Sequence, residues 1–259
     1  MSPVDFKSSL SIKHISTASA ILEIDGVNLL TDPFFSPAGT EWDMGVTVLK
    51  ISDTPALGLQ DLPPIDAVLL SHEDHPDNLD ELGRRLLDGR KVITTVDGAR
   101  KLHPRPGVRG IRPWETVSLE AGGKRFEVTG TPCRHLPGGE CTGFILTTPE
   151  FGSTDGLPNA IYFSGDTVYF EELVEMRDKF HIVVAVLNLG AAKVALPDGQ
   201  LQITMDGKQA ARLFREIKAD ILSWGHFTQN GKELAKEFEG EGIQDNVCWL
   251  TPGVSKKVL

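Results

Sequence analysis

Residues 69–80 read L-L-S-H-E-D-H-P-D-N-L-D, which places a short polar turn directly after an apolar run. The run itself, Ala67 to Leu70, suits an interior strand because it is short, apolar and preceded by two prolines. Leucines at helical spacing follow the turn, so we expect a helix whose N-cap is Asp77 or Asn78. The polar residues therefore form a strand-to-helix turn at one end of a sheet.

The side chains of this turn are of the kinds that hold a divalent metal ion. Imidazole nitrogen, as in His72 and His75, and carboxylate oxygen, as in Asp77, are ligands that Zn²⁺, Mn²⁺ and Fe²⁺ accept. Such a turn also occurs as a capped helix start without metal, so both interpretations stay open from this stretch alone. Three more potential ligands stand alone in loops, each directly after an apolar run: His135, Asp166 and His226.

The length and composition are those of an ordinary soluble protein, and they predict one globular domain over residues 1–259. A chain of 259 residues can bury a full core, and 40% hydrophobic and 24% charged residues are typical of globular proteins. A net charge of -10 disfavours nucleic acid as a partner. No run approaches the ~20 apolar residues of a membrane span, and residues 1–13 lack a signal peptide's apolar core. We expect a cytoplasmic protein without stable membrane insertion.

Turn signals and apolar runs predict the architecture. Asp25-Gly26 and Gly122-Gly123 each separate two strand-like runs, so each predicts a β-hairpin. Strand patterns alternate with helical patterns further along the chain. Two mixed sheets packed face to face with outer helices are therefore expected, an α/β (α+β) fold. Residues 36–64 are expected to be a long loop, and Asp32 either points at the metal site or only forms a turn before proline.

Taken together, these segments resemble the metallo-beta-lactamase superfamily. The order and the intervals of the potential ligands fit that family: 63 residues lead from His72 to His135, 31 more to Asp166 and 60 more to His226. The opening, with A-I-L-E-I at 20–24 and L-L-T-D-P at 29–33, is similar to one branch of it. That branch contains the ascorbate-phosphate lactonase and N-acylphosphatidylethanolamine phospholipase D. The resemblance implies a four-layer αββα sandwich with the metals at one edge of the two sheets.

The first motif departs from the family's pattern His-x-His-x-Asp-His. A gapped register, His-x-x-His-x-Asp-Asn, keeps His72 and His75 as ligands, gives Asp77 the place of the family's Asp and puts Asn78 at the last His. An ungapped register makes Asp74 the second ligand instead. We prefer the gapped register because it keeps two histidines and the aspartate. An amide oxygen is a poorer Zn²⁺ ligand than imidazole, so a second metal position is expected to be weak, filled by Mn²⁺ or empty.

Under the gapped register, the resemblance implies one or two divalent ions, Zn²⁺ first and Mn²⁺ or Fe²⁺ as alternatives. The implied positions are His72, His75 and His135 for one ion, Asp77 and His226 for the other, and Asp166 between them, with Asn78 and Asp74 doubtful.

A metal-dependent hydrolase is the function that such a cluster predicts. A bound ion makes hydroxide available near neutral pH, which Asp77 or Asp166 would orient toward an ester, lactone, amide or phosphodiester of a small molecule. An iron-dependent, dioxygenase-like oxidoreductase is one alternative, because His72, His135 and Asp166 approximate a two-His, one-carboxylate site. A noncatalytic metal-binding homologue is another. Whether the chain forms a homo-oligomer stays open.

Overall fold

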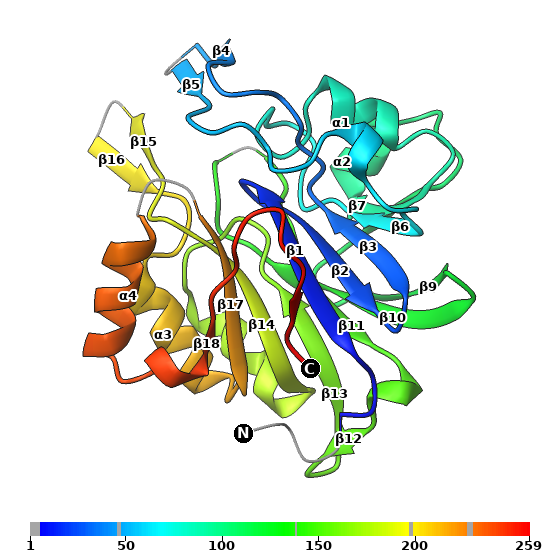
Figure 1. Ribbon diagram of the computed structural model, residues 1–259, viewed down its shortest axis with the longest axis vertical. Coiled ribbons are helices and arrows are strands. Elements are labelled where there is room, and N and C mark those ends of the chain that lie inside the picture. The colour runs from blue at the N-terminus through cyan, green and yellow to red at the C-terminus, as the bar shows by residue number, and fades with distance from the viewer. Residues whose placement is uncertain (1–5, 46–47, 138, 197–198, 227–229) are drawn as a thin grey trace.

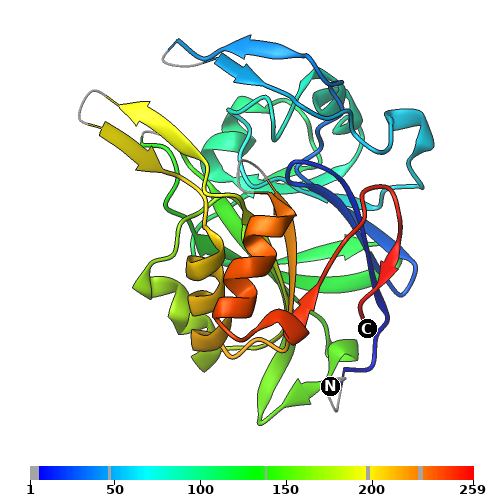
Figure 2. The same cartoon turned by 60° about the vertical axis from the view of Figure 1, so that its left-hand side comes forward.

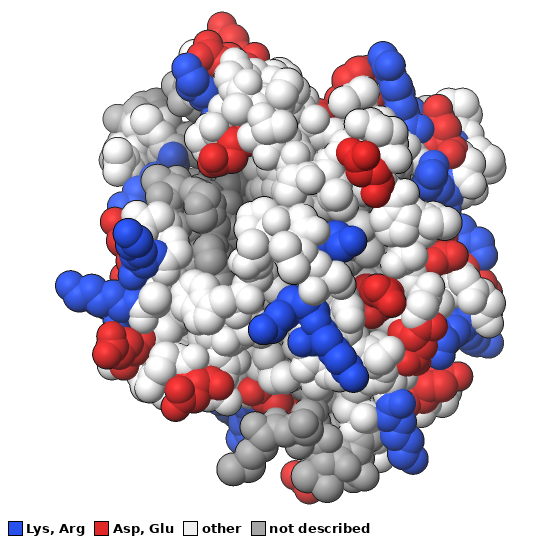
Figure 3. All heavy atoms as spheres, viewed as in Figure 1, with Lys and Arg blue, Asp and Glu red and all other residues white. Residues whose placement is uncertain are grey.

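The computed structural model describes residues 6–45, 48–137, 139–196, 199–226 and 230–259, without the side chains of residues 224–226. Two mixed sheets lie face to face, and helices cover their outer faces (Figures 1 and 2). Within the described ranges, no helix has both the length and the apolar character that a membrane crossing needs. On the face that Figure 3 shows, acidic and basic side chains are interspersed rather than gathered by sign.

The first sheet begins with the predicted hairpin and continues into parallel strands. Its spatial order is β19 (Lys256–Lys257), β1 (Leu10–Ser16), β2 (Ser19–Ile24), β3 (Val27–Thr31), β6 (Ala67–Leu69), β7 (Lys91–Thr95) and β8 (Val108–Ile111). β2 and β3 pair antiparallel around Asp25-Gly26, whereas β3, β6, β7 and β8 are parallel. Parallel pairing of β3 with β6 brings the ends of both strands to the same edge of the sheet.

The second sheet has the same mixed character. Its order is β18 (Val247–Cys248), β17 (Ile221–His226), β14 (His181–Leu189), β13 (Leu157–Phe163), β11 (Thr142–Thr147), β10 (Lys124–Pro132) and β9 (Thr116–Ala121), with β12 (Ser153–Thr154) beside β13. Two small hairpins stand apart, β4 (Glu41–Asp43) with β5 (Val48–Lys50) and β15 (Lys193–Leu196) with β16 (Gly199–Gln202).

Three apolar clusters hold the layers together, which confirms the predicted αββα order. Leu22 and Leu69 of the first sheet and Phe126 of the second belong to one buried cluster. A second cluster joins β14 and β17 to α3 (Gly207–Glu216), α4 (Gly231–Gly240) and the 3₁₀ helix η3 (Glu171–Asp178). A third lies between the first sheet and α1 (Glu81–Leu86) and includes Leu102, which directly follows α2 (Val96–Lys101).

Two local predictions were wrong. The helix after the polar turn is capped by Asp80, whose side chain accepts the Gly83 N–H at 2.7 Å, and not by Asp77 or Asn78. The reason is that the backbone N–H groups of Asn78 and Leu79 both donate to the His75 carbonyl and close a separate turn first. The expected loop at 36–64 contains the β4–β5 hairpin and a short 3₁₀ helix, η1 (Leu59–Asp61).

Candidate metal centre

The candidate centre lies where the two sheets meet at one edge. After β6, the polar turn crosses toward the second sheet, and the Ser71 carbonyl accepts the N–H of Thr142 at the start of β11 (3.0 Å). Gly165 follows β13 with φ +57, and a Cβ there would lie 2.6 Å from the Thr142 carbonyl oxygen. Only glycine therefore lets the segment that carries Asp166 approach this closely.

Three imidazoles converge at this edge. His72 Nε2 lies 2.9 Å from His75 Nδ1, and His135 Nε2 lies 3.3 Å from the same atom. The ligand nitrogens of all three are within 4.8 Å of one another. The three rings line a cavity of about 250 Å³, into which Cys141 and the exposed Asp74 also face. The structure thus brings together the three histidines expected to hold one ion.

Hydrogen bonds on the far sides of two rings determine where their protons lie. The His135 Nδ1–H donates to the Ile203 carbonyl (2.9 Å), which can only accept. His72 Nδ1 lies 2.8 Å from Ser71 Oγ, and that hydroxyl donates to Asp32 Oδ2 (2.9 Å). The Ser71 hydroxyl has one proton, which it donates to Asp32, so it accepts the His72 Nδ1–H. The Nε2 atoms of His72 and His135 then both turn a lone pair toward His75.

Burial favours the neutral form of His72 and His135, which is the form that binds a metal ion. Desolvation lowers the pKa of His72 well below its usual value, and the neighbouring histidines lower it further. Desolvation also lowers the pKa of His135, although the hydrogen bond to Ile203 opposes the shift. The Nε2 atoms of His72 and His135 both face His75 Nδ1, and a shared cation could be ligated at that point. Three imidazole nitrogens are a common ligand set for Zn²⁺.

Two carboxyl groups stand beside the rings. Asp166 is buried and its Oδ1 accepts a hydrogen bond from Asn188 Nδ2 (2.8 Å). Burial raises the pKa of Asp166 to about 6. Burial and the charge of Asp166 raise the pKa of Asp77 to about 6, while His75 and His135 act in the opposite direction. A cation placed among these groups would favour both ionised carboxylates.

Asn78 supplies an unsatisfied oxygen at the same edge. Its Nδ2 donates to Asp32 Oδ2 (3.3 Å), so the other end of the amide is the carbonyl oxygen Oδ1. Its Oδ1 is buried and has no hydrogen-bond partner among the described residues. Leaving such an acceptor unpaired costs about 1–3 kcal/mol, and a cation ligated by the oxygen would offset that cost.

Asp32 therefore does more than form a turn before proline. It is fully buried with φ +34, and it also accepts the Ser71 N–H at 2.6 Å. Burial raises its pKa well above the usual value, with a further contribution from Asp166, while the bonds from Ser71 and Asn78 oppose the shift. Asp32 holds the polar turn in place from the end of β3.

Two further acidic residues of the turn lie outside the cluster of ligand atoms. Glu73 is buried and forms ion pairs with Arg84 (3.0 Å) and Lys101 (2.9 Å), so it ties the turn to α1 and α2. Asp74 is exposed and does not belong to the cluster of ligand atoms, whereas His75 does. This placement supports the gapped register. His226 ends β17, but its side chain lies outside the described residues, so its predicted role stays a prediction.

Sequence reasoning missed the residues that hold the ligands in position. Ser71 stands next to His72 in the chain, but its link to Asp32 appears only once β3 and β6 are paired. Cys141 Sγ lies 3.6 Å from His72 Nδ1 and donates to the Asp166 carbonyl (3.3 Å). The pairing of β10 with β11 determines the position of Cys141, because Pro132 faces Thr142, the residue directly after Cys141. All three cysteines are free thiols.

Comparisons with known proteins place this chain in a family. Residues 27–227 match the family described as "Beta-lactamase superfamily domain". An uncharacterised protein of Mycobacterium tuberculosis (strain ATCC 25618 / H37Rv) is 28% identical over 220 residues, which are 81% of this chain and 55% of that protein. This chain thus spans about half the length of that relative.

Two further proteins match over nearly their full length. A UPF0173 metal-dependent hydrolase of Methanopyrus kandleri is 24% identical over 266 residues, covering 95% of this chain and 99% of its own. The solved structure of an isothiocyanate hydrolase from Delia radicum gut bacteria has a TM-score of 0.75 at 19% identity, covering 95% of this chain and 98% of its own. With the family match extending over well more than half of its residues, this chain belongs to the metallo-beta-lactamase superfamily.

Proposed function

We propose that this chain is a metal-dependent hydrolase that cleaves an ester, lactone, amide or phosphodiester of a small molecule. The observation that carries the proposal is the convergence of His72 Nε2, His75 Nδ1 and His135 Nε2. The Nε2 atoms of His72 and His135 both direct a lone pair toward His75 Nδ1. The relative from Methanopyrus kandleri named as a metal-dependent hydrolase supports the same activity.

The residues present fit one divalent ion well and a second ion less well. His72, His75 and His135 would hold the first ion, with Zn²⁺ the best match to three imidazoles and Mn²⁺ or Fe²⁺ as alternatives. Asp77 and His226 would hold the second, with Asp166 between the two. When bound, such an ion lowers the pKa of coordinated water to about 7 and polarises the bond under attack.

The chain's own groups would orient the reactants and move the proton. Asp77 and Asp166 lie beside the rings, where a bound cation would keep both carboxylates ionised, so that they could orient the attacking water and accept its proton. Asn188 holds the Asp166 carboxylate in one orientation through its 2.8 Å hydrogen bond. Asp32 and Ser71 hold the His72 ring with its Nε2 facing His75.

Within the superfamily, we propose the branch that contains the ascorbate-phosphate lactonase and N-acylphosphatidylethanolamine phospholipase D. Its support is the L-L-T-D-P stretch at 29–33, which carries Asp32. The contacts of Asp32 with Ser71 and Asn78 give this stretch a physical role at the metal centre.

Metal analysis combined with a substrate panel tests the proposal. Protein purified without added metal should contain about one equivalent of zinc or manganese, lose hydrolysis with a chelator and recover it with that metal. His135→Ala should lose metal and turnover together. His181→Ala is the matched control, since His181 pairs with Asp220 (2.8 Å) at the opposite end of β14 from Asn188.

Predominant iron with O₂ consumption would favour the oxidoreductase, and a metal-replete protein inert toward the whole panel would favour the noncatalytic homologue.

A further inference from the structure

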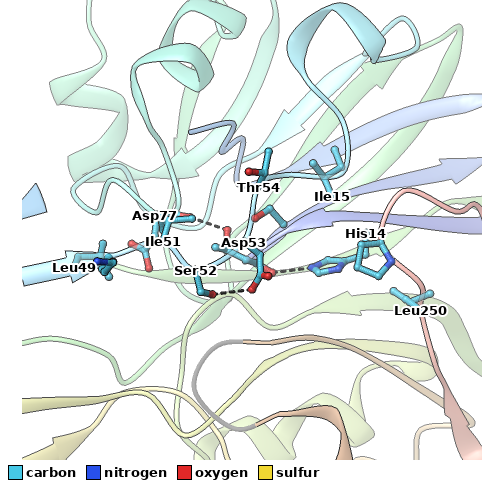
Figure 4. Close-up of a pocket in the computed structure, with 13 residues that line it drawn as sticks. His14, Ile15, Leu49, Ile51, Ser52, Asp53, Thr54, Asp77 and Leu250 are labelled. Carbon is cyan, nitrogen blue, oxygen red and sulfur yellow. Dashed lines mark hydrogen bonds between the residues drawn. The ribbon is translucent and has the colours of Figure 1, made fainter. Parts of the chain in front are cut away.

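A second cavity, of about 440 Å³, meets the candidate metal centre at Asp77. Its walls come from three segments that are distant in the sequence: residues 14–17 at the end of β1, residues 49–54 in and after β5, and Leu250 with Pro252 near the C-terminus. Figure 4 shows Asp77 on one side of this cavity, with His14 and Leu250 on the other. Its volume is within the range of pockets that bind small molecules.

Hydrogen bonds attach each wall to β1 or to the turn after it. The Gly253 N–H donates to the His14 carbonyl (2.8 Å) and the Ala56 N–H donates to the Ile15 carbonyl (2.9 Å). Thr17 Oγ1 donates to the Asp77 carbonyl (2.9 Å), which joins this turn to the metal centre. The cavity is therefore held in a fixed position relative to the proposed reacting groups.

The lining offers an aliphatic surface and few groups that would attract an anion. Five of its residues are aliphatic, namely Ile15, Leu49, Ile51, Leu250 and Pro252, and they lie among His14 and short hydroxyl side chains. Among the described lining residues, the one Lys or Arg is Lys50, and its ammonium group pairs with Glu41 at 2.7 Å. Asp53 and Asp77 add carboxylates to the same lining, and these would repel a phosphodiester anion.

We infer that this cavity binds the aliphatic part of a neutral ester, lactone or amide whose carbonyl group lies at the Asp77 end. The inference rests on the proposed function and narrows its substrate class, because it excludes phosphodiesters. Leu49, from the β4–β5 hairpin, and Leu250, from the C-terminal segment, then determine how long an aliphatic chain is accepted.

A series of p-nitrophenyl esters with acyl chains from two to ten carbons tests the inference on metal-replete protein. Each added methylene should raise kcat/KM about fourfold until the cavity is full, which corresponds to ~0.8 kcal/mol per buried CH₂. Beyond that length, kcat/KM should stop rising. The same kcat/KM for all chain lengths in the native protein would overturn the inference.

Substitutions in β5 locate the effect in this cavity. Leu49→Trp should move the preferred chain to a shorter length, whereas Leu49→Ala should move it to a longer one. Val48→Trp is the matched control, because the neighbouring strand position faces the opposite way and its side chain is 59% exposed. Identical chain-length profiles in the native protein and both Leu49 variants would contradict the assignment.

Binding of 2-undecanone, a neutral ketone that cannot be hydrolysed, separates this inference from the proposed function. The ketone should raise the melting temperature of metal-free native protein and of Val48→Trp, and it should bind Leu49→Trp at least tenfold more weakly. Ketone binding of this pattern without hydrolysis of any ester would support the cavity assignment and contradict the hydrolase. Metal-dependent hydrolysis without ketone binding would support the hydrolase and contradict the cavity assignment.

Discussion

Replacing Ser71 with alanine tests whether the residues behind the histidines prepare the metal centre. The hydroxyl donates to Asp32 (2.9 Å) and lies 2.8 Å from His72 Nδ1, so the variant loses both contacts inside the fold. A lost bond to a buried carboxylate and an unpaired imidazole N–H together should lower the free energy of unfolding by about 2–4 kcal/mol. Loss of such a supporting contact should also weaken metal binding about 10- to 100-fold.

Urea unfolding of metal-free protein measures the first effect, and competition with a chromophoric chelator measures the second. Ser9→Ala is the matched control, because the Ser9 hydroxyl also donates to a carboxylate, that of Asp25 (3.1 Å), but at an exposed site. This control should change stability by less than about 0.5 kcal/mol and leave metal affinity unchanged. If Ser71→Ala behaved like Ser9→Ala in both assays, the proposed orientation of His72 would be refuted.

Three further predictions follow from contacts in the turn and the first hairpin. Glu73→Gln should lower stability by about 1–3 kcal/mol, since it breaks two ion pairs to the following helices, yet keep the metal content measured by mass spectrometry. His75→Ala should lose the metal and Asp74→Ala should keep it; the opposite result would favour the ungapped register. Although burial opposes the shift, hydrogen bonds led by the Ser9 N–H lower the pKa of Asp25 from 3.8 to about 2. The stability advantage over Asp25→Asn should therefore be complete above about pH 4, near 1 kcal/mol after screening, and disappear in urea titrations as the pH falls through about 2.

The parts of the fold that were predictable are those with strong local signals. Asp25-Gly26 predicted the β2–β3 hairpin because a tight turn between two apolar runs has few alternatives. The apolar run at 67–70 predicted an interior strand, which the structure has at β6. By contrast, β4 and β5 are three residues each and mostly exposed, so no apolar pattern marked the hairpin inside the 36–64 segment.

The candidate site was predictable in its ligands but not in its supporting contacts. His72, His75 and His135 could be named because they follow apolar runs in a recognisable order. Asp32 and Ser71 are 39 residues apart, and only the parallel pairing of Thr31 with Leu69 brings them together. The cavity beside Asp77 depends on a C-terminal segment that no local pattern connects to β1. The single domain, the cytoplasmic location and the oligomeric state stay predictions.

Anomalous X-ray diffraction at the absorption edge of the bound metal tests the central claim most directly. We predict a peak within bonding distance, about 2.0–2.1 Å for zinc, of His72 Nε2, His75 Nδ1 and His135 Nε2. A crystal of metal-supplemented protein without such a peak, in which the three rings bond only to water or to one another, would contradict the account.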